Sequence, residues 1–101
     1  MDNIEDNLML CLAVCGHDGL VSKSEEECLF EIFNQHYSYD RSQFEKAVNK
    51  FFESEDSLEQ LLSRISDHKT ILIWAKQAAE ADGLDIRENI ALQRCYELIE
   101  L

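Results

Sequence analysis

The amino-acid sequence predicts an all-α fold, a compact bundle of six or seven helices formed by residues 1–101 as one domain. Three observations support this prediction. The chain has no proline and only three glycines, and these are the two residue types that interrupt helices. Hydrophobic residues make up 46% of the chain, enough for a core of modest size. Apolar residues also recur at helical spacing along nearly the whole chain.

Six successive segments carry apolar stripes at helical spacing, and the stripe from Phe44 to Phe52 follows the pattern i, i+3, i+4, i+7 and i+8 without a gap. In chain order these stripes cover Ile4–Cys15, Cys28–Phe33, Phe44–Phe52, Leu58–Ile65, Ile71–Ala79 and Leu92–Ile99. The predicted helices are 3–16, 22–36, 40–53, 57–66, 68–81 and 85–100. Because the connections are short, neighbouring helices must fold back on one another into a bundle.

Four of these helices begin with a pattern typical of a capping box, in which two side chains satisfy free backbone amides at a helix start. The pairs are Ser22 with Glu25, Asp40 with Gln43, Ser57 with Gln60, and Asp85 with Glu88. Before the first and the last of these four helix starts, the preceding helix ends at an Asp-Gly pair. Gly19 and Gly83 can adopt the left-handed conformation that stops a helix.

An internal repeat relates the two ends of the chain. Asp18-Gly19-Leu20 aligns with Asp82-Gly83-Leu84, and the helices before and after each turn align with one another. The sequence therefore predicts two pseudo-twofold helical hairpins, with residues 37–66 as the middle helical segment that joins them.

The charge of the chain is −12 and is unevenly distributed. Residues 1–40 contain nine acidic residues and a single base, Lys23. Such a field repels nucleic acid and anionic lipid, and it attracts cations or basic protein surfaces. We therefore expect a protein partner with a basic surface and no direct binding of nucleic acid.

Features of the sequence indicate a soluble cytoplasmic protein. The start MDNIEDN has no positive segment typical of a signal peptide. The longest apolar run, Leu8 to Cys15, is far shorter than the roughly 20 residues that span a bilayer. The four cysteines form no C-x-x-C pair, so we expect buried, reduced thiols. Cys11 and Cys15 are one helical turn apart, which leaves redox or soft-metal chemistry as an alternative.

The first Asp-Gly turn is similar to the second half of a calcium-binding loop. Asp18, Gly19 and Glu25 fit the pattern D-G-x-x-x-x-x-E, but Val14 and Gly16 provide no side-chain oxygen at the earlier ligand positions. Helix punctuation alone explains every residue of this motif. If the two turns approach one another, however, their pooled carboxylates could bind calcium or magnesium.

The stretches HDGLVSKSEEE and AEADGLDIREN resemble the A-D-G-x-x-x-x-x-E signature of the tellurite-resistance TerB-like family. Its fold is also seen in the cytoplasmic part of a membrane-linked J-domain co-chaperone. The resemblance implies an all-α, pseudo-symmetric domain with an acidic cluster that binds a divalent metal. It also implies interaction in stress response, in tellurite or phage resistance, and in membrane-associated complexes. The corresponding metal ligands here are Asp18, Glu25, Asp82 and Glu88. Two departures from the family pattern are His17 before Asp18 and the order Asp85-Ile86 after Gly83.

No serine or cysteine nucleophile has a placed partner and no glycine-rich phosphate loop occurs, so we expect no catalytic residues and no enzymatic activity. The sequence favours an interaction or adaptor protein. The alternative is an acidic inhibitor, an immunity protein or nucleic-acid mimic that occludes a basic partner. Trp74, Ile71 and Ile73 predict a central helix buried on all sides. In the alternative interpretation part of that helix, or Tyr37 and Tyr39, forms a docking surface.

Overall fold

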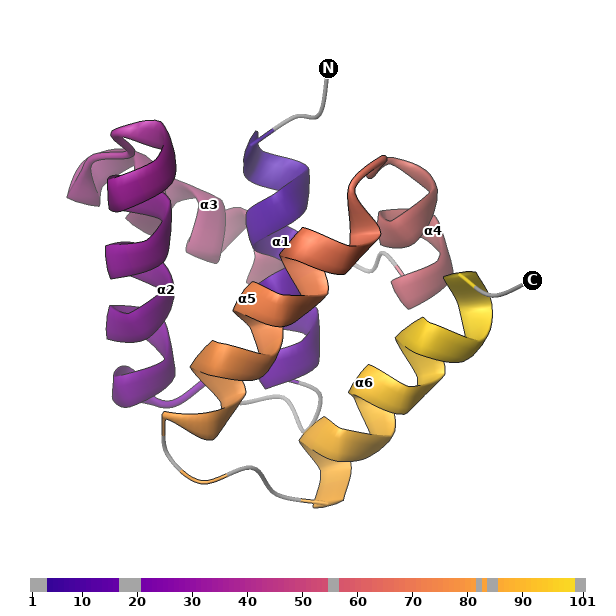
Figure 1. Cartoon of the computed structure of the whole chain (residues 1–101). Helices are drawn as coiled ribbons and strands as arrows, with labels where there is room; N and C mark the ends of the chain where they lie inside the picture. The colour runs from indigo at the N-terminus through magenta and orange to yellow at the C-terminus, as the bar shows by residue number, and fades with distance from the viewer. Residues whose placement is uncertain (1–3, 17–20, 55–56, 82, 84–85, 100–101) are drawn as a thin grey trace.

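The computed structural model describes residues 4–16, 21–54, 57–81, 83 and 86–99, and these are arranged as helices and short connections (Figure 1). The helices are α1 (Ile4–Cys15), α2 (Lys23–Tyr37), α3 (Arg41–Glu53), α4 (Leu58–Ser63), α5 (His68–Glu80) and α6 (Ile86–Ile99). No strand occurs among the described residues, so the prediction of an all-α fold is confirmed. Most helix bounds lie within a residue of the prediction, but α4 ends at Ser63 instead of continuing to residue 66.

Side chains cap four of the helices. Three predicted capping boxes are present, at Ser22–Glu25, Asp40–Gln43 and Ser57–Gln60. The fourth, Asp85–Glu88, falls outside the described side chains. The start of α5 has a cap that we did not predict, because Asp67 has no glutamate or glutamine three residues later. There Asp67 Oδ1 accepts a hydrogen bond from the backbone N–H of Thr70 at 3.4 Å.

Left-handed residues follow two of the helices. Gly83, after α5, has φ 84° as predicted, and its N–H donates to the carbonyl of Glu80 at 3.1 Å. Ser38 ends α2 with φ 55° and donates to the carbonyl of Asn34 at 2.9 Å. Both residues therefore satisfy carbonyls that a helix end leaves without intrahelical partners.

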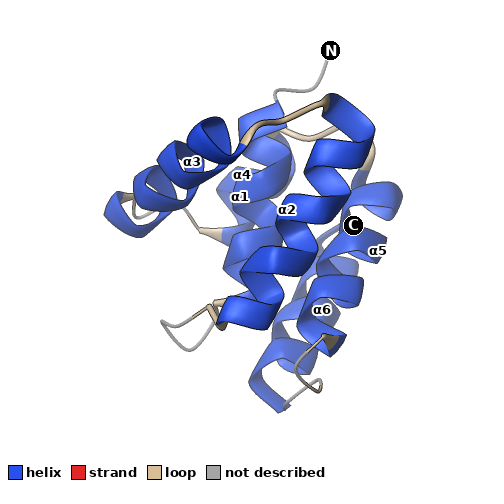
Figure 2. Ribbon diagram, turned by 90° about the vertical axis from the view of Figure 1, so that its left-hand side faces the viewer, coloured by secondary structure: helices blue, strands red, loops and turns tan. Residues whose placement is uncertain are grey.

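Helix α1 lies at the centre of the fold. Eight of its twelve residues are buried, which is expected of a helix that is covered on every side. Helix α5 crosses α1 and packs against it closely, and α2 packs against both α5 and α1 (Figures 1 and 2). Helices α3 and α4 pack on α1, and α6 covers α4, α1 and α5. The longest apolar run of the sequence is therefore the core helix.

The packing of the two repeat halves differs. Helix α2 of the first half lies mainly against α5, whereas α6 of the second half is in contact with α4 as well as with α1 and α5. The predicted pseudo-twofold arrangement is not confirmed by this packing. A physical reason for the difference is that α4 comes between the halves in sequence and gives α6 a neighbour that α2 lacks.

An ion pair fastens the start of α3 to α2. Arg41 donates two parallel hydrogen bonds to the carboxylate of Glu27, at 3.0 and 3.1 Å. Its guanidinium also lies 4.0 Å from the ring centroid of Phe30. The pKa of Glu27 is lowered because Arg41 donates to its charged form. Since the pair is exposed to water, we expect it to orient α3 more than to stabilise the fold.

No helix of the described residues is long and apolar enough to cross a membrane.

Candidate functional site

The structure describes only part of the predicted metal site. Asp18 and Asp82 lie outside the described residues, as does His17 beside Asp18. Glu88 belongs to α6, but its side chain is not among those described. Within the described part of the chain, no group of three or more histidine, cysteine, aspartate or glutamate residues could hold a metal ion. The four-residue ligand set remains a prediction.

Glu25 is the one member of this set whose side chain is described, and it is engaged in the capping box of α2. Its Oε1 accepts a hydrogen bond from the backbone N–H of Ser22 at 2.8 Å. In return, the N–H of Glu25 donates to Ser22 Oγ at 3.1 Å. The side chain is only 4% exposed. A carboxylate at this position is thus accounted for by the helix start, whose amides stabilise its negative charge.

The helix ends that flank the two repeated turns lie at the same end of the molecule. Figures 1 and 2 are related by a rotation about the vertical axis. In both, the end of α1 and the start of α2 lie low, as do the end of α5 and the start of α6. The predicted metal site requires both turns to lie at one pole, and it stays a prediction because most residues of the turns lie outside the described part of the chain.

An aromatic cluster joins the two segments that the sequence suggested separately as docking surfaces. The ring of Phe33 lies 5.6 Å from Trp74, 5.5 Å from Tyr37 and 6.3 Å from Tyr39, between ring centroids. Tyr37 in turn meets Trp74 edge-on at 5.8 Å. Phe33 is fully buried, and the other three side chains are half-buried. Such edge-on contacts hold the rings in defined orientations.

His36 completes this cluster at the surface. Its ring stacks on the indole of Trp74 with a centroid distance of 4.6 Å and an interplanar angle of 28°. The sequence did not predict this contact, because His36 and Trp74 are far apart in the chain and His36 belongs to no motif. His36 lies one turn after Phe33 and Ile32, on the same side of α2 as the buried stripe. That spacing could have indicated that His36 packs against a neighbouring helix.

Helix α5 is not buried on all sides, and this part of the prediction was wrong. Ile73 is 58% exposed and Trp74 is half-buried, because α1 and α2 cover one side of α5 and leave the opposite side open. We call the group formed by the exposed His36 and Ile73 and the half-buried Trp74 the α2–α5 aromatic surface.

Asn7 is a buried polar residue that links α1 to this cluster. Its Nδ2 donates to the hydroxyl of Tyr37 at 3.3 Å. Its Oδ1 has no hydrogen-bond partner among the described residues, although the side chain is only 3% exposed. The hydrogen bond between Asn7 and Tyr37 therefore fixes the end of α2 against α1. It comes at a cost in free energy, because the buried Oδ1 of Asn7 loses its hydration.

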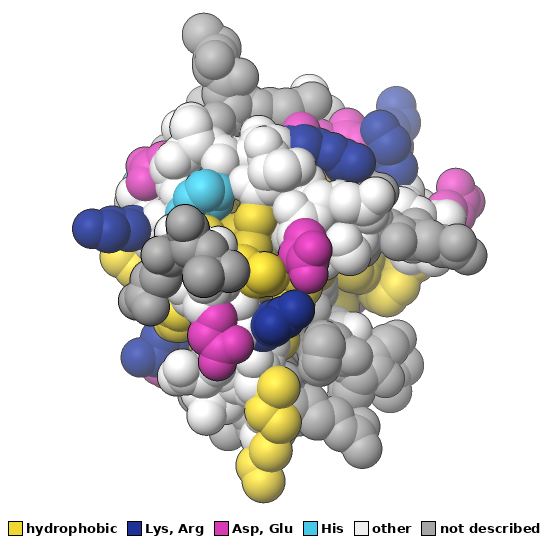
Figure 3. Space-filling model, turned by 90° about the vertical axis from the view of Figure 1, so that its right-hand side faces the viewer, with side chains coloured by type: hydrophobic (Ala, Val, Ile, Leu, Met, Phe, Trp, Pro, Cys, Tyr) yellow, Lys and Arg dark blue, Asp and Glu magenta, His cyan; other side chains and the backbone are white. Residues whose placement is uncertain are grey.

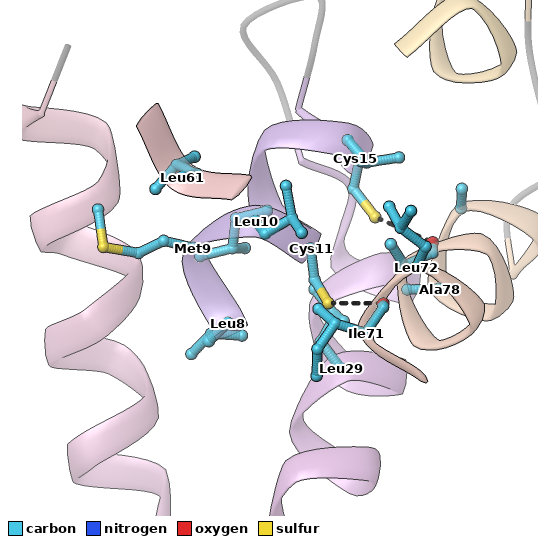
Figure 4. Packing of buried hydrophobic residues seen from close by; sticks show 14 of the residues in the cluster. Leu8, Met9, Leu10, Cys11, Cys15, Leu29, Leu61, Ile71, Leu72 and Ala78 are labelled. Atoms are coloured by element: carbon cyan, nitrogen blue, oxygen red, sulfur yellow. Dashed lines mark hydrogen bonds between the residues drawn. The ribbon is translucent and has the colours of Figure 1, made fainter. Parts of the chain in front are cut away.

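The prediction that the cysteines are buried is confirmed for three of the four, and Cys28 is half-buried. All four cysteines are free, and three of them, Cys11, Cys15 and Cys95, are buried. The thiols of Cys11 and Cys15 point from α1 to the backbone carbonyls of Ile71 and Ala75 in α5, at 3.6 and 3.8 Å (Figure 4). Burial raises the pKa of the Cys11 thiol far above its ordinary value and that of Cys95 to about 11. A thiol held in this way is a weak nucleophile.

An apolar depression of about 380 Å³ lies on the side of the molecule that includes α4 and α6. Figure 3 shows hydrophobic side chains on this side next to a histidine and charged groups. The lining residues are Glu59, Leu62, Ser63, His68, Leu98 and Ile99. The polar ones are already engaged: His68 Nε2 is 2.7 Å from the carbonyl of Leu62, and Glu59 pairs with Arg94 at 3.3 Å. Nothing in this depression specifies a ligand.

Together, the fold and these surfaces define a small acidic helical domain with an exposed aromatic surface. Comparison with known proteins adds no relative, since no family model, no curated protein and no solved structure matches the chain.

Proposed function

We propose that the chain is a non-enzymatic interaction domain of the TerB-like kind, an adaptor that docks a protein partner with a basic surface. The observation that carries this proposal is the α2–α5 aromatic surface, where His36 stacks on Trp74 and Ile73, the residue before Trp74 in α5, is exposed. Tryptophan is among the residues that contribute most to binding energy in protein interfaces.

The packing beneath this surface favours a docking role. Trp74 is held edge-on by Phe33 and Tyr37, so its orientation is set before a partner arrives. Little side-chain entropy is then lost when the partner binds, which improves affinity without additional contact area. The apolar side chain of Ile73 is exposed to water here, although nearby exposed positions of α5 carry the polar residues Lys76 and Gln77.

Charge supports a basic partner. The chain carries a net charge of −12, and α2 itself bears Glu26, Glu27 and Glu31. A field of this sign accelerates the approach of a basic surface and weakens as salt screens it. The resemblance to the TerB-like family supports a role in stress response or in tellurite or phage resistance, with a membrane-associated complex as one setting.

The test of docking uses two exposed isoleucines of nearly equal exposure. We expect Ile73→Glu to abolish capture of the partner from the native cell, because it places a charge within the aromatic surface. Ile90→Glu is the matched control: Ile90 is 55% exposed and lies on α6, so its replacement should leave capture unchanged. Captured partners should be basic and should dissociate as sodium chloride is raised. Equal capture by both variants would contradict the proposed surface.

A divalent cation at the repeated turns is the second part of the proposal. Calcium or magnesium should raise the melting temperature of the wild-type chain, and Asp18→Asn and Asp82→Asn should each remove most of that increase. Glu25→Gln is a useful companion variant, because the amide keeps an oxygen for the capping box while it removes the charge. No response of the wild-type protein to either cation would leave the turns with a purely structural role.

The same capture experiment separates the adaptor from the acidic inhibitor. A nuclease or toxin whose capture is lost when DNA is added would support the inhibitor or nucleic-acid mimic. A partner that DNA does not displace, and that depends on Ile73, supports the adaptor.

A further inference from the structure

A second hollow, of about 350 Å³, lies between the start of α1 and one side of α3, away from the exposed His36 and Ile73. It is lined by Ile4, Glu5, Tyr39, Gln43, Lys46, Ala47 and Lys50. Its volume falls in the range of sites that bind small molecules. Unlike the apolar depression beside α4, it combines an apolar floor with polar groups that are available to a ligand. We call it the α1–α3 hollow.

The charge of this lining is opposite in sign to that of the chain. Lys50 Nζ and Glu5 Oε1 lie 2.6 Å apart and neutralise one another, and this contact raises the pKa of Lys50. Lys46 has no ion-pair partner in the described part of the structure. The lining therefore carries one uncompensated positive charge, although the whole chain has a charge of −12.

The remaining polar groups of the hollow are hydrogen-bond donors. Gln43 Oε1 accepts a hydrogen bond from the backbone N–H of Asp40 at 3.1 Å, and the NH₂ group of the same side chain can donate to a ligand. Lys46 follows three residues later and shares that side of α3. Burial, together with Glu5 and Asp40, raises the pKa of the Tyr39 phenol, which therefore keeps its proton at neutral pH and can donate.

We propose that the α1–α3 hollow binds a small organic monocarboxylate with a short apolar chain. Lys46 and the Gln43 amide would hold the carboxylate, because ammonium and amide donors make charge-assisted hydrogen bonds to it. The apolar chain of the ligand would lie over Ile4, Ala47 and the ring of Tyr39. A single negative charge suits the site, since the field of the whole chain repels a dianion about twice as strongly as a monoanion.

Titration of the labelled full chain with hexanoate, followed by amide chemical shifts in nuclear magnetic resonance, tests this proposal. We expect saturable shifts centred on Ile4, Gln43 and Ala47. Hexanamide and hexylamine have the same chain length without the negative charge, and each should bind at least about fivefold more weakly. Shifts that do not saturate or that avoid these residues would overturn the proposal. So would hexylamine binding as tightly as hexanoate.

The variant Lys46→Met tests the role of the ammonium group. Lys46 is exposed, so its replacement leaves the core intact, and methionine retains most of the apolar stem. We expect about a fivefold loss of hexanoate affinity or more. Lys69→Met, at an exposed position of α5, is the matched control and should bind hexanoate as the wild type does. Unchanged affinity in Lys46→Met would refute the proposed site.

Discussion

At the scale of single residues, Glu25 shows how one side chain can satisfy two interpretations of a motif. Its spacing from Asp18 is that of a closing calcium ligand, and its spacing from Ser22 is that of a capping-box glutamate. The structure shows the capping contacts directly. A capping carboxylate needs no metal, because the free amides of the first turn already stabilise it.

The capping box at Ser22 makes a testable contribution to stability. We expect Ser22→Ala to lower the free energy of unfolding by about 1 kcal/mol, because the N–H of Glu25 loses its acceptor. Ser24→Ala, at an exposed position in the first turn of the same helix, should change it by less than about 0.5 kcal/mol. Urea unfolding measures both values. Equal effects of the two variants would show that the box does not stabilise α2.

Thiol reactivity is the second residue-scale prediction. Cys28 is half-buried whereas the other three cysteines are buried, so a thiol reagent should modify Cys28 first in the folded protein. Burial and the neighbouring Glu31 raise the pKa of Cys28. Its thiolate fraction, and with it the rate, should therefore still be rising at pH values where an ordinary thiol has levelled off. Peptide mapping identifies the modified residue. Comparable labelling of Cys11 or Cys15 in the folded state would revive the redox interpretation.

At the scale of elements, the contact between α1 and α5 organises the fold. Ala75, Ala78 and Ala79 are fully buried, and such small residues allow the two helices to approach closely. The closeness of this approach is visible in the thiols of α1 that reach backbone carbonyls of α5. Periodicity identified both helices, but it could not show that their faces meet each other rather than those of other helices.

Enlarging one of these alanines should therefore be costly. We expect Ala75→Leu to lower the free energy of unfolding by about 1–3 kcal/mol, because the added atoms must displace α1 or force strained rotamers. Gln77→Leu introduces the same residue on the exposed side of α5 and should have little effect. Thermal and urea unfolding of both variants check this. A stable Ala75→Leu variant would mean that the interface has space that the packing does not suggest.

At the scale of the whole molecule, the chain has 21 acidic and nine basic residues. This excess of negative charge dominates the long-range electrostatic interactions. Local pairs such as Arg41 with Glu27 and Lys50 with Glu5 neutralise part of it, but most of the acidic side chains that the structure describes are exposed to solvent. Like charges held together by the fold repel one another, which lowers the stability of the compact state.

Screening should relieve this repulsion. We expect the midpoint of urea unfolding to rise when sodium chloride is increased from about 0.01 M to about 0.15 M, since the screening length falls from about 30 Å to about 8 Å. Sucrose at matched osmolality provides a control for solvent effects that do not depend on charge. A midpoint that falls with salt would indicate that favourable ion pairs outweigh the repulsion. Partner binding should respond to salt in the opposite direction, because screening weakens attraction to a basic surface.

The sequence by itself determined the helices, most of their caps and the core side of most of them. These depend on interactions between residues close in the chain, such as Ser22 with Glu25 or the apolar spacing from Phe44 to Phe52. Only the tertiary structure decided that Ile73 faces solvent, that His36 stacks on Trp74, and that Lys46 and Gln43 border a hollow with Ile4. The physical reason is that helical periodicity tells which residues share a face, whereas the neighbours of that face are set by how all the helices fill the core together.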